Sequence, residues 1–226
     1  MGKYDELLSS SLAELGLAFD ADQMKQLNAY IAELELWNPA YKLVGAEGEE
    51  LITKHIIDSL SAVKTIQGLL SSYTEPHIAD LGSGAGLPGI PLAIALKGCH
   101  VTLVERMGRR VGFLRNALAI CRLTDRVEVC DKDLKEVGGT FHLITFRAFR
   151  PLYDILDAVE PILAEDGVVV AYKGQEENLR VELEKVAQTC TSRWDSSEVS
   201  LSVPHLEAQR MLCLLQKHDT FLKERC

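Results

Sequence analysis

From residue 77 onward, short apolar runs alternate with amphipathic segments, and this alternation constrains the fold more than any other feature of the chain. The predicted strands span residues 77–81, 100–105, 127–130, 141–146 and 167–172, and helical patterns such as 109–121 and 151–163 separate them. Strands that alternate with helices imply βαβ units and a mostly parallel sheet. A last run over 210–215, with 195–203 as its antiparallel partner, brings the sheet to about seven strands with helices on both faces.

The first 75 residues lack strand patterns and predict helices instead. Leucines between Leu7 and Leu17 lie close to helical spacing. A second helix is expected over 21–37, capped by Asp20 and ended by Asn38-Pro39, because a residue before proline disfavours the helical conformation. A third helical stretch covers about 49–70. We therefore expect a helical extension over 1–75, an α/β domain over 76–217 and a tail over 218–226.

Composition excludes several classes of protein. Apolar residues make up 47% and charged residues 25% of the 226-residue chain, as in ordinary globular proteins. No stretch approaches the ~20 consecutive apolar residues of a membrane span, and the first residues do not resemble a secretory signal. The six cysteines form no CxxC pair and show no spacing typical of a metal site or a disulfide framework. We expect a cytoplasmic monomer without a metal or a membrane partner.

The charge of the chain is unevenly distributed. A formal net charge of −9 argues against nucleic-acid binding, which requires Lys and Arg. Residues 105–126 nevertheless hold six arginines against only Glu105 and Asp125, a local balance of +4. A basic patch on an acidic protein remains compatible with an RNA partner.

A glycine-rich loop lies between the first predicted strand and a helix expected over 90–96. In one frame, Gly84, Gly86 and Gly89 match the dinucleotide fingerprint. In the other, Asp80 and the glycines resemble the first motif of Rossmann-like methyltransferases, and Glu105 at the end of the second strand would hold ribose hydroxyls in either frame. The methyltransferase frame is favoured because Gly82 already ends the strand and Asp80 precedes it by two residues. We predict S-adenosylmethionine as the cofactor, bound at Gly82, Gly84, Gly86 and Glu105.

Asp133 follows the third predicted strand by a few residues. In methyltransferases of this fold, an acid there commonly contacts the edge of the adenine. A solvated loop acid explains the pattern equally well, and both interpretations stay open at this point.

Further motifs extend the resemblance beyond the loop. They are the segment 86–92, the segment 54–60 with Lys54-His55 and Asp58, the segment 108–114, Arg147-Ala148-Phe149, Lys173-Gly174-Gln175, and Trp37-Asn38 followed by Tyr41 and Leu43. Together they closely resemble the RsmG (GidB) family, whose members methylate N7 of a guanine in bacterial 16S ribosomal RNA. The resemblance covers roughly residues 30–217, in the order of the family's motifs.

The resemblance implies roles for individual residues. Gly82 and Leu87 match positions that contact the cofactor, and Lys132 and Asp133 match the pair that frames its adenine. Arg147 matches the family arginine near the reactive end of the cofactor. The basic positions expected to face ribosomal RNA or the ribosomal particle are Arg109, Arg110, Lys173 and Arg210.

The chemistry implied by the resemblance requires few catalytic groups. Guanine N7 attacks with a ring lone pair and carries no proton, so no general base is expected and the catalytic residue stays unassigned, with Arg147 a candidate for positioning. No Pro-Cys marks a C5 methyltransferase, and the place of the Asn-Pro-Pro-Tyr motif of amine methyltransferases reads Phe146-Arg147-Ala148-Phe149. His55 and Asp58 share one helix face and are interpreted as locking the N-terminal helices onto the sheet.

Three other functions compete with an RNA methyltransferase. The same fold could methylate a small molecule, because a fold does not fix the substrate. A nucleotide-sensing or ribosome-binding module could retain the cofactor loop without catalysis. The dinucleotide frame leaves a nicotinamide oxidoreductase as the third alternative.

Overall fold

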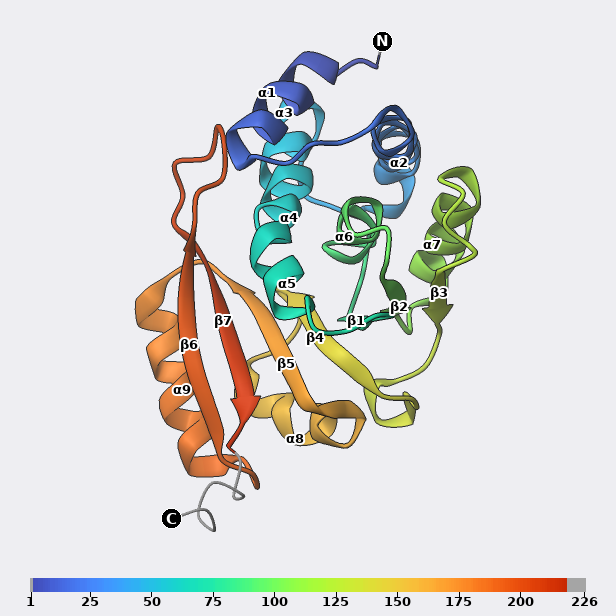
Figure 1. The fold of residues 1–226 in the computed structure, drawn as a ribbon. Helices are drawn as coiled ribbons and strands as arrows, with labels where there is room; N and C mark the ends of the chain where they lie inside the picture. Colours follow the sequence, from blue (N-terminus) through green and yellow to red (C-terminus); the bar gives the residue numbers. More distant parts are fainter. Residues whose placement is uncertain (1, 219–226) are drawn as a thin grey trace.

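The computed structural model describes residues 2–218 and contains one seven-stranded sheet with the strand order β3-β2-β1-β4-β5-β7-β6 (Figure 1). The strands are β1 (His77–Leu81), β2 (His100–Val104), β3 (Val127–Cys130), β4 (Phe141–Arg147), β5 (Leu163–Lys173), β6 (Trp194–Leu201) and β7 (Arg210–Lys217). Neighbours from β3 to β5 pair in parallel, whereas β7 runs antiparallel to both β5 and β6. The predicted α/β fold and the β6–β7 pair are therefore confirmed.

Helices cover both faces of this sheet (Figure 1). The α-helices are α1 (Asp5–Leu15), α2 (Ala21–Tyr41), α3 (Gly48–Leu51), α4 (Asp58–Leu60), α5 (Val63–Leu69), α6 (Gly89–Ala95), α7 (Gly108–Ile120), α8 (Leu156–Val159) and α9 (Glu176–Thr189). A π-helix, Ile52–Ile57, joins α3 to α4, and short 3-10 helices span Leu134–Glu136, Leu152–Asp154 and Glu160–Ile162. Helices α1, α2 and α4–α7 share one hydrophobic cluster, while α8 and α9 belong to the other.

The central strands are buried on both faces, as parallel strands covered by helices must be. In β1, Ile78 joins the cluster of the N-terminal helices, whereas Ala79 and Leu81 join the cluster of α8 and α9. The N-terminal helices thus lie on the sheet within one continuous core. The division into an extension, a domain and a tail stays a prediction, and residues 219–226 of the expected tail lie outside the described part of the chain.

Helix α2 continues past the end that Asn38-Pro39 predicts. Pro39 lies inside the helix, which ends only at Tyr41, and Lys42 closes it in the left-handed conformation with a φ of 49°. Asn38 accounts for the difference: its amide donates to the carbonyl of Ala46 and accepts from the backbone N–H of Val44. These buried hydrogen bonds fix the next loop and keep the last turn helical at the cost of one backbone bond.

No described helix has the length and apolar character needed to cross a membrane.

Candidate active site

The glycine loop leaves the carboxyl end of β1 in a tight left-handed path. Gly82, Gly84 and Gly86 have φ values of 65°, 57° and 89°, which side-chain-bearing residues rarely adopt. A Cβ on Gly84 would have no neighbour closer than 3.7 Å, whereas one on Gly86 would overlap the Ile90 side chain. Gly84 therefore opens the loop into a glycine cradle, whereas Gly86 serves the packing of the loop on α6. A Cβ on Gly82 would overlap the Phe149 ring.

Asp80 anchors this loop from below. Its Oδ2 accepts a hydrogen bond from the N–H of Gly89 at 3.0 Å, and the Ser83 hydroxyl donates to the Asp80 carbonyl at 2.8 Å. Burial raises the pKa of Asp80 to about 7. Its Oδ1 is buried without a hydrogen-bond partner in the described structure. The start of the glycine loop is thus tied to the start of α6 through one carboxyl group.

Glu105 joins the loop to the end of β2. Its Oε2 accepts from the N–H of Gly84 at 3.0 Å and its Oε1 from the N–H of Met107 at 2.8 Å, while Nη1 of Arg110 lies 3.5 Å from Oε2. A carboxylate has about four lone-pair positions, so acceptor sites remain for two hydroxyl groups. The residue is 5% exposed. This geometry fits a ribose-binding acid.

Tyr30 of α2 supports the loop from the opposite side. Its hydroxyl donates to the carbonyl of Ala85 at 2.7 Å, and the side chain is fully buried. The N-terminal helices thereby reach the glycine loop directly.

Two cavities open at this edge of the sheet. The larger has a volume of about 780 Å³ and includes Leu87, Arg147 and Lys173 in its lining. The smaller, about 260 Å³, is lined by Glu105, Lys132, Asp133 and neighbouring residues. Both cavities share five lining residues, namely Gly82, Arg110, Ala148, Phe149 and Arg150. The carboxyl edge of a parallel sheet is where ligands bind in open α/β folds.

Arg147 ends β4 inside a polar network in the larger cavity. Its Nη1 donates to Oδ2 of Asp58 at 2.7 Å and to the Lys54 carbonyl at 3.3 Å, and its Nη2 lies 3.0 Å from Nδ1 of His55. Both acceptors Lys54 and His55 belong to the π-helix, a form that often occurs at functional sites. The Arg147 side chain is 17% exposed, and these contacts hold its guanidinium in place.

The other oxygen of Asp58 holds a second arginine. Oδ1 accepts from Nε of Arg210 at 2.9 Å, at the start of β7. Burial, together with the charge of Arg147, lowers the pKa of His55 to about 4, so its imidazole is neutral near pH 7. One buried carboxylate thus pairs with two guanidinium groups, and His55 adds no further charge.

Lys173 is paired inside the cavity wall. Its ammonium lies 2.9 Å from Oε1 and 2.7 Å from Oε2 of Glu182 on α9, and its side chain is 14% exposed. Glu182 also accepts from the N–H of Leu152 at 2.8 Å. The RNA contact expected of Lys173 stays a prediction, because this ammonium already has a carboxylate partner.

Most of the predicted site residues meet at this edge. Gly82, Gly84, Leu87, Arg110, Arg147, Lys173 and Arg210 line the larger cavity; Glu105, Lys132 and Asp133 line the smaller. Asp133 also caps the 3-10 helix Leu134–Glu136. Gly86 and Arg109 line neither cavity, and Arg109 is exposed on α7.

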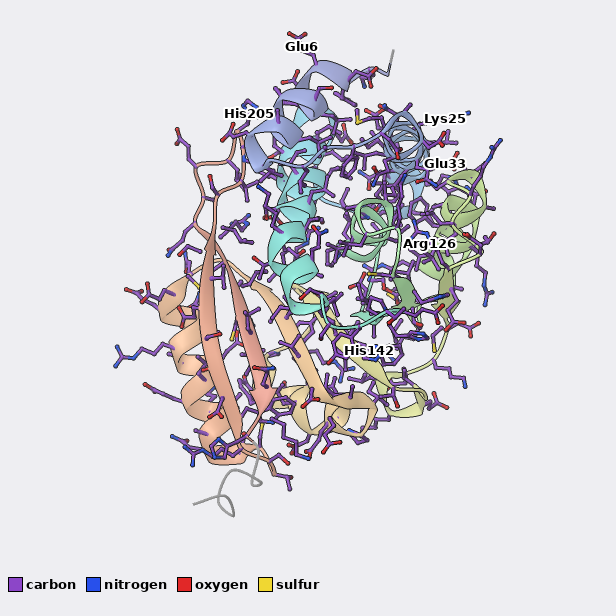
Figure 2. The ribbon with its side chains drawn as sticks, viewed as in Figure 1. Glu6, Lys25, Glu33, Arg126, His142 and His205 are labelled. Atoms are coloured by element: carbon purple, nitrogen blue, oxygen red, sulfur yellow. The ribbon has the colours of Figure 1, made fainter. Side chains whose placement is uncertain are left out.

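The arginines of 105–126 do not form one surface. Arg126, labelled in Figure 2, precedes β3 and therefore lies at the amino-terminal end of the sheet, away from the glycine loop. Its Nη1 is buried without a partner in the described structure, and Arg115 pairs with Asp131 at 2.9 Å. Of the six arginines, Arg106, which precedes α7, and Arg110, near its start, line the cavities.

The sequence patterns missed four residues of the site. Tyr30, Phe149 and Glu182 were assigned no role, and Asp58 was assigned only a locking role in the N-terminal helices. For Asp58, the spacing to His55 on one helix face was the available signal. Tyr30 and Phe149 act through contacts with the glycine loop, which is far from both in the chain, and Glu182 pairs with Lys173 across the short connection between β5 and α9.

Comparison with known proteins places the chain among RNA-modifying enzymes. The family model described as rRNA small subunit methyltransferase G matches residues 23–213. A "Ribosomal RNA small subunit methyltransferase G" from Nitrosococcus oceani is 36% identical and covers 94% of each chain. One from Cupriavidus pinatubonensis is 34% identical over 93% of this chain and 92% of its own. The crystal structure of a protein from Agrobacterium tumefaciens, described as a predicted O-methyltransferase, matches with a TM-score of 0.54 at 22% identity. The match covers 74% of this chain and 82% of that one, and it shows a shared fold.

Proposed function

Because the chain belongs to the rRNA small subunit methyltransferase G family, we propose that it transfers a methyl group from S-adenosylmethionine to N7 of a guanine in small-subunit ribosomal RNA. The observation that carries this proposal is one cleft edge that combines the glycine cradle, the acid Glu105 and the network around Arg147. We place the reaction in the cytoplasm and assign it to a monomer.

The smaller cavity suits the adenosine part of the cofactor. Glu105 has acceptor sites left for ribose hydroxyls, and Lys132 and Asp133 lie where an adenine edge would be read. Gly82, Gly84 and Leu87 would line the path toward the larger cavity. When bound, S-adenosylmethionine supplies an activated methyl group on a sulfonium. The protein's own task is then to align the acceptor, and alignment can supply about 7–11 kcal/mol of a reaction barrier.

The larger cavity has the excess of positive charge expected of an RNA-binding site. Six basic side chains line it against two acidic ones, although the whole chain carries a net charge of −9. The basic residues are Lys54, Arg110, Arg147, Arg150, Lys173 and Arg210, and the acids are Asp58 and Glu182. A cleft lined by one sign of charge attracts a ligand of the opposite sign, here the phosphate backbone.

The neutral state of His55 fits a reaction at guanine N7. This nitrogen carries no proton, so the site needs no base, and its purine gains positive charge on methylation. Asp58 neutralises part of the charge of Arg147 and Arg210, which limits repulsion of the purine by these guanidinium groups. Through these pairs, Asp58 keeps Arg147 and Arg210 at fixed positions, where they can donate hydrogen bonds while part of their charge is neutralised.

A methyl-transfer assay tests this function. Small ribosomal subunits that lack their native methylations and the naked RNA extracted from them are each incubated with radiolabelled S-adenosylmethionine, and the nucleosides are separated. We expect label in 7-methylguanosine with at least one of the two substrates. Binding of S-adenosylmethionine by calorimetry without any label in RNA would contradict the proposal and direct the search to small-molecule acceptors.

A further inference from the structure

Phe149 lies directly on the cofactor loop. A Cβ built on Gly82 would overlap the Phe149 ring, so that face of the glycine is already covered. Phe149 and Gly82 are both among the residues shared by the two cavities. The ring therefore stands at the boundary between the cavity of Glu105 and the cavity of Arg147.

Neither side of this boundary alone contains all the predicted cofactor contacts. The smaller cavity, at about 260 Å³, falls below the range of roughly 300–1,000 Å³ typical of small-molecule sites. Glu105 lies on that side, whereas Leu87 and Arg147 lie on the other. A molecule that contacts both sets crosses the residues that the two cavities share, and the Phe149 ring rests on one of them, Gly82. Movement of the ring away from Gly82 would widen the passage between the two sides.

The backbone around Phe149 belongs to no regular element. Ala148 has a φ of 49°, a left-handed conformation that a residue with a Cβ adopts at a cost. Residues 148–150 form bends between β4 and the 3-10 helix Leu152–Asp154. Within residues 2–218, Arg150 forms no salt bridge, and its guanidinium carbon lies 5.1 Å from the centre of the Phe149 ring. The turn can therefore rearrange without breaking an ion pair.

Phe149 is also the aromatic ring that is best placed to meet an acceptor base. Three Phe or Tyr residues line the cavities within the described chain. Phe146 and Tyr172 are only 2% and 6% exposed, and the Tyr172 hydroxyl is held by the Ser59 carbonyl at 2.8 Å. Phe149 alone is partly exposed. Unstacked RNA bases are commonly held on aromatic side chains.

We propose that Phe149 leaves Gly82 when the cofactor site fills and then stacks on the guanine to be methylated. This inference rests on the proposed function. Methylation at N7 leaves the purine cationic, and an aromatic face attracts a cation. Stacking on Phe149 is thus expected to favour the charge that develops on the acceptor as well as to hold its plane, so its loss affects kcat in addition to KM.

Three variants separate these roles. Phe149→Leu keeps an apolar side chain without a ring, Phe149→Trp keeps an aromatic face, and Tyr153→Leu removes a neighbouring aromatic that lines neither cavity. Affinity for S-adenosylhomocysteine is measured by calorimetry on the protein alone. The kcat and KM for methyl transfer are measured with undermethylated small ribosomal subunits or their RNA, and thermal unfolding confirms that each variant is folded.

We expect Phe149→Leu to bind S-adenosylhomocysteine at least as tightly as the unmodified protein and to lose about tenfold or more in kcat/KM, since base–aromatic stacking has that magnitude. Phe149→Trp and Tyr153→Leu should stay within about threefold. A fully active Phe149→Leu would overturn the stacking, and a loss of S-adenosylhomocysteine affinity in that variant would assign the ring to the cofactor site instead. An unmodified protein that binds S-adenosylhomocysteine but labels no RNA would refute the proposed function, and the stacking with it.

Discussion

Oδ2 of Asp58 accepts a hydrogen bond from Nη1 of Arg147 at 2.7 Å and thereby ties the N-terminal helices to the carboxyl end of β4. Asp58 is 2% exposed, so this charge pair is largely shielded from water. The same carboxylate holds Arg210 through its other oxygen. An acid from the N-terminal helices thus sets the position of two arginines that line the larger cavity.

Replacement of Asp58 by Asn should weaken both the fold and the reaction. The amide cannot balance two guanidinium groups, and removing one partner from a buried pair costs about 3–5 kcal/mol. We expect a loss of at least about 2 kcal/mol in the free energy of unfolding in urea and a fall in kcat/KM of more than tenfold. Asp131→Asn is the matched control, because its pair with Arg115 is exposed and should change stability by less than about 1 kcal/mol. Equal stability of the two variants would contradict the role of Asp58.

The pH dependence of the free energy of unfolding should show that His55 is held neutral in the folded protein. Its pKa is about 4 in the folded protein, against about 6.5 when unfolded, so the unfolded chain binds the extra proton between these values. This contribution makes stability fall as the pH falls from 6.5 to 4. His55→Gln lacks this contribution. Between pH 4 and 6.5, its free energy of unfolding, measured in urea, should therefore rise less steeply with pH than that of the unmodified protein, by up to about 1.4 kcal/mol per pH unit. Identical slopes would show that His55 is not held neutral.

Asp80 should contribute to the pH dependence of stability with the opposite sign. Burial raises its pKa to about 7, so between pH 4 and 7 the folded protein binds the proton that the unfolded chain releases. This contribution makes stability rise as the pH falls and partly cancels that of His55 in the unmodified protein. Asp80→Asn should therefore become less stable, relative to the unmodified protein, as the pH falls from 7 to 4. A difference in stability that is constant over this range would contradict the raised pKa.

Tyr30→Phe should loosen the glycine loop from α2. The variant removes one buried hydrogen bond to the Ala85 carbonyl, which is worth about 1–1.5 kcal/mol. We expect that loss in the free energy of unfolding and an affinity for S-adenosylhomocysteine reduced severalfold in calorimetry. Tyr41→Phe is the control on the same helix, because Tyr41 is 38% exposed and lines neither cavity. An unchanged affinity in Tyr30→Phe would show that the loop does not depend on this bond.

RNA affinity should fall as the salt concentration rises, because basic residues line the larger cavity. Each phosphate contact adds about −0.7 to the slope of log K against log salt for single-stranded RNA. Arg150→Gln should make this slope shallower by about that amount in filter-binding titrations. Arg180→Gln, on the exposed side of α9, should leave it unchanged. Equal slopes for the two variants would remove Arg150 from the RNA-binding surface.

The fold follows from local patterns wherever burial on both faces produced continuous apolar runs. Strand β1 spans the predicted residues 77–81, and β2 ends at Val104, one residue before the predicted end at Glu105. Helix α9 was not predicted, although Leu179, Leu183 and Val186 have helical spacing, because its many charged residues obscure that stripe. The prediction that Asn38-Pro39 ends α2 was wrong, because a local pattern does not reveal the side-chain contacts of Asn38 with the following loop.

The polar network of the site lies beyond such patterns. Asp58 and Arg147 are 89 residues apart in the chain, and their pairing depends on how the N-terminal helices lie on the sheet. The same is true of the hydrogen bond from Tyr30 to the glycine loop, while the position of Phe149 over Gly82 depends on a turn whose conformation no motif specifies. Residue types indicated which groups carry the chemistry, but the packing determined their partners.

Chemical cleavage at 7-methylguanosine tests the central claim most directly. Undermethylated small ribosomal subunits, and separately their naked RNA, are incubated with the protein and S-adenosylmethionine; the RNA is reduced with borohydride and cleaved with aniline, and the break is mapped by primer extension. We predict one new cleavage site 3′ to a guanine, absent without the cofactor. An RNA that remains intact with both substrates, while the protein binds S-adenosylhomocysteine, would contradict methylation at guanine N7.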